Sequence, residues 1–362
     1  MERADRVLSE AVERGRPVGA RGVVADATVS LTDLRFHRPA HTGVGREDVL
    51  RELEAATQVF EEIGEKAGLG RALCLRGKVR FWGGDSASAI EDLELAAGYA
   101  RAAGDQVQEA ESLHYVLAVL CRGSTPVEEA LERVAEIHSR AGANRRVERA
   151  ALASRATLEA MLGRFDAARD LIRRESVLAE ELGLEVRLRA QVAIGAGDIE
   201  LLAADPAAAE LALRPACEVL ERIGELGFLA SAAPPLAEAL YLQGRDDEAL
   251  LMTERWAPER LTVPEDVDAQ VGWRRVRAKL LARRGHFEAA ERLAREATAS
   301  VLRTDFLDLR ARAVADLAEV LRLAGRSGES AAAVQEAIRL YERKGNTAAA
   351  AALASTTAAR TP

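Results

Sequence analysis

The chain has 362 residues, of which 48% are hydrophobic and 30% are charged, and this balance excludes an intrinsically disordered protein. A formal net charge of −8 argues against a general nucleic-acid surface, because such a surface needs a dense basic face. A chain of 362 residues is also too long for one ordinary globular core, whereas a repeat array avoids that limit because each repeat packs only on its neighbours.

The beginning of the chain predicts helices joined by one irregular loop. Residues 2–14 carry apolar side chains at helical spacing and predict an amphipathic helix, which we expect either to follow further repeats or to cap the array. Residues 20–36 and 47–66 predict a degenerate first helix pair. The stretch 37–46 between them contains Pro39 and glycines, and it predicts a loop.

Regular helix pairs follow along most of the remaining chain. Their predicted bounds are 69–83 with 86–103, 106–122 with 126–141, 146–162 with 165–182, 186–203 with 206–223, 228–243 with 246–257, 268–284 with 287–302, and 306–324 with 328–344. The longest irregular insertion, 258–267, is the best candidate for a mobile loop or hinge. The Ala- and Thr-rich tail, 347–362, predicts a short last helix that covers the final repeat and then frays. No strand pattern is visible.

A turn signal recurs through these pairs. In the copy that begins at Gly285, the glycine ends one helix, Phe287 packs into the turn, and Ala290 lets the next helix lie close against the first. Equivalent positions recur at steps of 39 to 41 residues, and they are occupied by Gly84, Gly123, Gly163, Ala204, Gly244, Gly285 and Gly325. A near-constant period of this size is the sequence signature of a helical solenoid.

A second feature repeats with the same period. Seven residues before the marker we expect a small residue, because two helices cross there at close range. The small residues in this column are Gly77, Ala156, Gly197, Ala237, Ala278 and Ala318. Val116 is the exception. It belongs to the Gly123 copy, which is displaced: its alanine, Ala130, comes seven residues after the marker, so its turn should be two residues longer. In this copy 125–128 has the order of a capping box, with Pro126 at the first helical position.

This pattern resembles tetratricopeptide repeats, in a variant stretched from their usual period of about 34 residues to about 40. Three stretches, 124–130, 316–326 and 340–346, also resemble the repeat region of actinobacterial adenylate/guanylate cyclase-like proteins. Those proteins carry an ATP-binding signalling domain ahead of the repeats, as do large LuxR-type regulators with similar arrays. The resemblance covers about residues 50–346, and the cyclase and nucleotide-binding modules themselves are absent from this sequence.

The resemblance implies an all-α, right-handed superhelical solenoid of helix-turn-helix repeats. We divide the chain into an N-terminal helix with a degenerate first repeat at 1–67, seven repeats at 68–346, and an Ala-rich cap or tail at 347–362. The resemblance further implies a regulatory role beside an ATP-binding or cyclase-like module, in the same chain or on another protein.

One stripe of basic residues is a candidate binding surface. Arg275, Lys279 and Arg283 are spaced by four and therefore share one face of a helix. By resemblance, the first helix of each pair lines a concave groove, and Arg312 and Arg322 project nearby from the next repeat. We hypothesise that this part of the groove holds an acidic segment or carboxylate of a partner through charge-assisted hydrogen bonds. The alternative is a solvated helix face.

The stripe is not basic in every repeat. Glu319 interrupts the positive run, and the equivalent positions of two earlier copies hold Asp198 and Glu238. Tyr241 is one of several large aromatic residues near repeat junctions, and it either anchors a ligand or packs in the interior.

The sequence gives little indication of a phosphate-binding loop, a metal site or a cofactor site. No GxxxxGK[ST] phosphate loop exists, and His37 and His41 share a loop without a third metal ligand, so we expect no metal site and no cofactor. The cysteines, Cys74, Cys121 and Cys217, are expected to be reduced core thiols. The start lacks a signal-peptide pattern and no apolar run is long enough for a membrane span, so we expect a cytoplasmic protein.

We therefore expect a scaffold or sensor that binds a protein or peptide, with no catalytic centre. The second hypothesis is a small-molecule (inducer) sensing domain of a LuxR-type regulator. A long open channel would favour a peptide, whereas a closed concavity of roughly 300–1,000 Å³ would favour a small ligand. An enzyme would need titratable groups clustered in a pocket.

Overall fold

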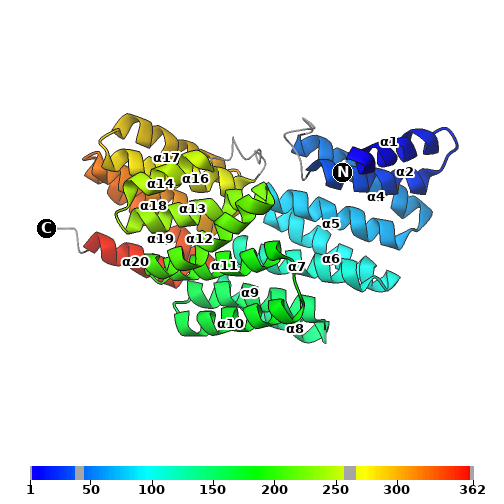
Figure 1. Cartoon of the computed structure of the whole chain (residues 1–362), viewed down its shortest axis with the longest axis horizontal. Coiled ribbons are helices and arrows are strands. Elements are labelled where there is room, and N and C mark those ends of the chain that lie inside the picture. Colours follow the sequence, from blue (N-terminus) through cyan, green and yellow to red (C-terminus); the bar gives the residue numbers. More distant parts are fainter. Residues whose placement is uncertain (1, 37–44, 143, 257–265, 359–362) are drawn as a thin grey trace. The chain divides into compact units, whose positions relative to one another are not determined.

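The structure, a computed structural model, describes residues 2–36, 45–142, 144–256 and 266–358 (Figure 1). Within these ranges the chain forms α-helices and no strand, which confirms the all-α prediction. The helices fall into two compact units, residues 1–119 and 120–362, and the division lies inside one helix. The predicted loops at 37–46 and 258–267 lie almost wholly outside the described residues.

Unit 1 is built from the first helices of the chain. They are α1 (Glu2–Gly15), α2 (Arg21–Phe36), α4 (Arg46–Ile63), α5 (Lys66–Trp82), α6 (Ser86–Ala103) and most of α7 (Gln106–Arg122). The amphipathic helix α1 packs on α2, and α2 packs on α4. The predicted helix 47–66 was too long at its end, because Gly64 takes a left-handed conformation (φ 70°) and Glu65 already caps the next helix by accepting from the amide of Gly68.

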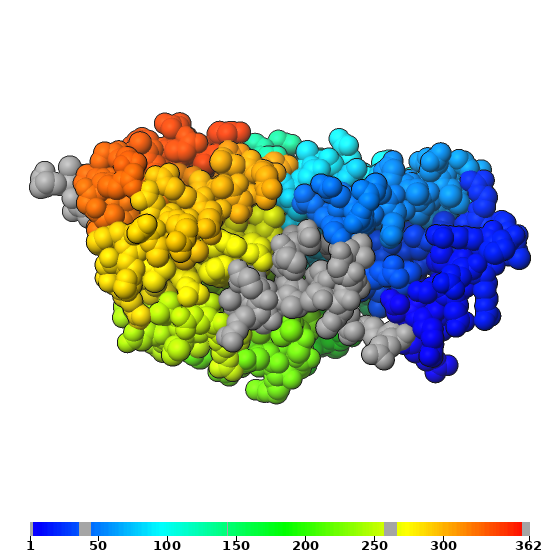
Figure 2. All heavy atoms as spheres, turned by 90° about the horizontal axis from the view of Figure 1, so that it is seen from above, coloured from blue at the N-terminus to red at the C-terminus, as the bar shows by residue number. Residues whose placement is uncertain are grey.

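Unit 2 contains the remaining helices. They are α8 (Val127–Ala141), α9 (Arg145–Met161), α10 (Phe165–Glu181), α11 (Val186–Leu202), α12 (Pro206–Ile223), α13 (Leu226–Leu242), α14 (Asp246–Arg255), α16 (Val267–Arg283), α17 (Phe287–Val301), α18 (Leu307–Leu323), α19 (Ser327–Lys344) and α20 (Thr347–Ala358). Each helix packs on the next along the chain, and the first helices of successive pairs, α9, α11, α13, α16 and α18, also contact one another. This is the stacking expected of a solenoid. Figure 2 shows α16 and α17 packed together on one face, in yellow to orange.

The predicted turn markers are confirmed in the backbone. Five marker glycines, at 84, 163, 244, 285 and 325, have φ between 75° and 81°. Ala204 stands at the same position with φ 60°, and no other non-glycine residue in the described part of the chain has a positive φ. The Gly123 copy differs as predicted: its second helix starts at Val127, four residues after the marker, whereas α10 starts two residues after Gly163.

The small-residue column marks close helix crossings. A Cβ on Gly197 of α11 would lie 2.3 Å from Cγ of Leu213 on α12, and one on Gly77 of α5 would lie 2.6 Å from Cγ of Leu93 on α6. The alanines of the column are buried as well. The predicted small residues are therefore required by packing between the two helices of a pair.

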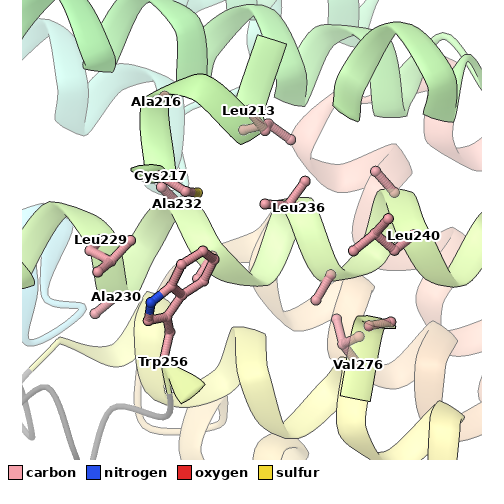
Figure 3. Close-up of a cluster of buried hydrophobic side chains, with 14 of the residues drawn as sticks. Leu213, Ala216, Cys217, Leu229, Ala230, Ala232, Leu236, Leu240, Trp256 and Val276 are labelled. Carbon is pink, nitrogen blue, oxygen red and sulfur yellow. The ribbon is translucent and has the colours of Figure 1, made fainter. Parts of the chain in front are cut away.

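The largest described core of unit 2 surrounds α13. Leu229, Leu236 and Leu240 of α13 lie between α12, which contributes Cys217, and the segment that ends at Trp256 (Figure 3). Trp256 donates its indole N–H to Glu221 Oε1 at 3.1 Å, so its polar group is satisfied although the ring is buried. The three cysteines are free and buried, as expected.

The last helices of unit 2 contact its first residues. Lys344, at the end of α19, is fully buried, and its Nζ donates to the carbonyl oxygens of Leu120, Gly123 and Thr125 at 3.1, 2.9 and 2.7 Å. The helix α20 that follows packs on α9. We call this contact, between residue 344 and the turn 120–125, the clasp.

The turn that takes part in the clasp differs from one prediction. The capping box expected at 125–128 does not form: the N-cap residue is Pro126, it makes no side-chain cap, and helix α8 starts one residue later. Thr125 instead presents its carbonyl oxygen to Lys344. The longer turn therefore binds an ammonium group, which is favourable beside the carbonyl end of a helix.

Candidate partner-binding cavity of unit 2

A small cavity lies inside unit 2, where first helices of several repeats converge. Its volume is about 90 Å³, and it is lined by the end of α7, by α9 and α11, and by the starts of α16 and α18. The charged lining residues are Arg122, Asp198, Asp268, Asp308 and Arg312. The apolar ones include Ala160, Met161, Ile199, Leu202, Phe306 and Leu309. The cavity therefore combines apolar walls with a few charged groups, as ligand sites commonly do.

Two ion pairs lie in the lining of this cavity. Arg122 pairs with Asp268, and Arg312 Nε lies 2.7 Å from Asp308 Oδ2. The other oxygen of Asp308 accepts from the side-chain amide of Asn346 at 2.6 Å. The negative charge of Asp308 raises the pKa of Arg312, so this guanidinium remains charged. Each guanidinium of the cavity is thus already bound to a carboxylate.

Asp198 is different. Among the described residues, no ion pair or hydrogen bond of its carboxylate is found, although it lies at the cavity wall. Burial raises the pKa of this carboxyl, and the nearby charges of Arg312 and Arg122 oppose that effect without cancelling it. The cavity therefore holds three carboxylates and two guanidiniums.

The predicted basic stripe lies elsewhere on the first helices, and its charges are paired within the protein. Arg275 Nε lies 2.6 Å from Asp316 Oδ2. Lys279, only 2% exposed, contacts Asp316 at 3.0 Å and Glu238 Oε2 at 2.7 Å. Burial disfavours the ammonium charge, but Asp316 and Glu238 hold the pKa of Lys279 above its usual range.

The third basic residue of the stripe and the predicted aromatic residue form one group. Arg283 lies 2.8 Å from Asp246 Oδ1 and donates to the carbonyl oxygen of Tyr241 at 2.9 Å. Its guanidinium also stacks over the ring of Tyr241, 3.4 Å from the centroid. The Tyr241 hydroxyl donates to Glu319 at 2.6 Å, and the residue is fully buried.

The stripe is therefore an ion-pair network between α13, α16 and α18, and its centre is not a solvated helix face. Of the residues predicted for the site, Arg312 alone lines the cavity, whereas Arg322 is exposed on α18. Partner binding by the stripe stays a prediction. Sequence reasoning did not predict Arg122, Asp198 or Asp268 as site residues, and it named Asp198 only as an acidic residue at the position equivalent to the basic stripe. A signal existed for Asp198, which stands six residues before its marker, as Lys279 does in its own repeat.

Other described features limit the chemistry. No group of three or more His, Cys, Asp or Glu side chains that could hold a metal ion occurs within the ranges given above. His37 and His41 fall outside those ranges. None of the helices described is long and apolar enough to cross a membrane.

Several solved structures share this fold. A Rap protein complexed with competence and sporulation factor matches with a TM-score of 0.60 and 12% identity, over 94% of this chain and 99% of the other. NprR in complex with its cognate peptide NprX matches with a TM-score of 0.52 and 13% identity, over 69% and 71% of the two chains. Aspartyl phosphate phosphatase F from Bacillus subtilis matches with a TM-score of 0.50 and 14% identity, over 86% and 81%.

At these identities the likeness shows the fold alone, that of tetratricopeptide-like helical repeat proteins. No protein-family model matches the sequence. No curated protein matches it either.

Proposed function

We propose that this chain acts by binding, without catalysis, and that unit 2 captures a peptide or an extended segment of a protein partner on its first helices. The observation that carries the proposal is the small cavity formed where α7, α9, α11, α16 and α18 converge. A volume of about 90 Å³ is well below the roughly 300–1,000 Å³ of small-molecule pockets. It suits one side chain of a longer ligand better than a whole cofactor or inducer.

The shared fold supports this proposal. Two of the structures with this fold are described as complexes with a competence and sporulation factor and with a cognate peptide. We further propose that the bound state of unit 2 regulates a signalling ATPase, cyclase-like or transcriptional module, in the same chain or on another protein. The resemblance of three stretches to cyclase-like repeat regions motivates this part.

A small-molecule sensor is the second candidate. A hollow of about 500 Å³ between α8, α9 and α10 is within the usual size range, and its lining combines Leu131 and Val134 with His138, Arg155 and Arg174. This hollow is separate from the cavity, so the two candidates predict different effects of substitutions.

The test is retention of peptides from an equimolar random heptapeptide library, read by mass spectrometry. We compare the full chain with two variants. Leu202→Trp places a large side chain in the cavity lining. Leu211→Trp is the control, because Leu211 on α12 is 79% exposed. We expect the parent chain and Leu211→Trp to retain the same peptides and Leu202→Trp to lose them. Equal retention by all three, or no retained peptide, contradicts the proposal.

A further inference from the structure

We infer that the cavity of unit 2 recognises a cationic group, an alkylammonium or alkylguanidinium, through the carboxylate of Asp198. This inference rests on the proposed function and names the ligand chemistry that the same site takes. Two kinds of ligand carry such a cationic group: a peptide with a Lys or Arg side chain, and a free small amine. The experiment separates these two sources.

The first argument is the pairing pattern along the first helices. The residue six positions before the marker is Asp198 in α11, Glu238 in α13, Lys279 in α16 and Glu319 in α18. Lys279 binds Glu238 of the preceding repeat. Glu319 accepts the hydroxyl of Tyr241. Asp198 therefore occupies the equivalent position in α11 without a hydrogen-bond or ion-pair partner among the described residues.

The second argument is that the cavity's positive charges are already bound. Arg122 pairs with Asp268, and Arg312 pairs with Asp308. An anionic ligand would have to displace one of these carboxylates, whereas a cation needs only the free carboxylate. The carboxylate of Asp198 is partly buried and has no hydrogen-bond or ion-pair partner among the described residues, and a bound cation with N–H donors would supply one.

The third argument is the shape of the cavity. Met161, Leu202 and Leu309 provide apolar walls. Lys and Arg side chains bury their methylene groups against such walls while their charged end group finds a polar partner. A volume of about 90 Å³ leaves room for the end of such a side chain and excludes a large ligand.

The experiment uses the full chain and two kinds of probe. Propylguanidinium and butylammonium represent the free source, and peptides retained from the heptapeptide library represent the peptide source. We expect the retained peptides to be enriched in Arg or Lys at one position. Replacing that residue by the uncharged citrulline or norleucine should weaken binding roughly 10- to 100-fold in calorimetric titration, because one charge-assisted hydrogen-bonded contact is lost.

Substitution of the protein gives the matched comparison. Asp198→Asn should weaken binding of the basic peptide by a similar factor, whereas Asp166→Asn, a fully exposed aspartate on α10, should leave it unchanged. Asn has the shape of Asp without its charge, so the thermal unfolding temperature of Asp198→Asn should not fall. If that variant fails to fold, the citrulline comparison on the parent chain still decides the question.

The pH dependence provides an independent readout. A cation binds the ionised form of Asp198, so affinity should rise with pH as this carboxyl ionises, over a range above its ordinary pKa. The charged groups that line the cavity with it, Arg122, Asp268, Asp308 and Arg312, are held in two ion pairs. The affinity of the Asp198→Asn variant should not rise with pH in this way.

The outcomes separate the two proposals. Retained peptides without a basic preference, or with affinity unchanged in Asp198→Asn, overturn the inference and leave peptide binding intact. Asp198-dependent binding of propylguanidinium without any retained peptide supports the inference and contradicts the proposed function. Binding of neither probe overturns both.

Discussion

At the scale of single residues, the effect of a substitution follows from the backbone conformation of the residue or from the charged groups beside it. Charge reversal at Arg275 illustrates the point. It would be the obvious test of partner binding by the basic stripe, but it places a carboxylate beside Asp316, inside a network that joins α16 and α18. Breaking such a buried pair costs about 3–5 kcal/mol, so loss of binding would report loss of folding. The stripe should therefore be tested at exposed Arg322 rather than at Arg275.

At the same scale, we predict that Ala204→Gly stabilises unit 2. Ala204 has φ 60° at a position where five other repeats have glycine. A left-handed conformation costs a residue with a side chain about 1–2 kcal/mol, and the extra freedom of glycine in the unfolded chain offsets about 0.5–1 kcal/mol of the gain. We expect the free energy of unfolding by urea to rise by about 0.5–1 kcal/mol.

Ala203→Gly is the control for this prediction, because Ala203 precedes the same turn with φ −74°. That variant should be no more stable than the parent chain. Equal stabilisation by both substitutions would mean that the left-handed conformation is not the cause.

At the scale of helices, the two helices of a pair are joined by the approach of a small residue to a large one. Gly197 of α11 faces Leu213 of α12, and both are buried. Because both residues must fit where the two helices cross, a larger residue seven positions before the turn would require a smaller residue opposite it. This explains why the column of small residues recurs with the repeat.

We predict that Gly197→Ala destabilises unit 2 by about 1–3 kcal/mol, because its Cβ would lie 2.3 Å from Leu213 Cγ. The measurement is urea unfolding followed by circular dichroism. Gly227→Ala in α13, where a Cβ meets nothing within 4 Å, serves as the control and should be neutral or stabilising by up to about 1 kcal/mol. A normal stability of Gly197→Ala would show that the two helices separate at little cost.

At the scale of the molecule, the clasp joins the last helices of unit 2 to its first residues. The two sides of the clasp, residues 120–125 and residue 344, are far apart in sequence. Asp308 connects this region to the cavity, because it binds Asn346, two residues after Lys344, and also Arg312. The turn at 120–125 and the end of α19 therefore lie together.

We predict that Lys344→Met opens the clasp. The substitution leaves the three carbonyl oxygens of Leu120, Gly123 and Thr125 without their donor, and we expect a loss of about 2–4 kcal/mol in the free energy of unfolding. Hydrogen exchange should become faster around 126–130 and 345–350 while α13 stays protected. Arg343→Met, one residue earlier and exposed, should leave exchange unchanged. Normal exchange in Lys344→Met would mean that the clasp does not hold these segments together.

The sequence by itself determined the helices, their turns and their stacking order, because these depend on contacts within one repeat or between neighbours. The predicted helix ends agree with the structure within three residues. The displaced Gly123 copy was visible as an irregular spacing, but its contact with Lys344 was not, since that residue is more than two hundred positions away in the sequence. Likewise, the partners of Arg275 and the free carboxylate of Asp198 depend on which side chains the packed helices bring together. Only the tertiary structure decides which charges are paired, because pairing is a property of distances in space and not of positions along one helix.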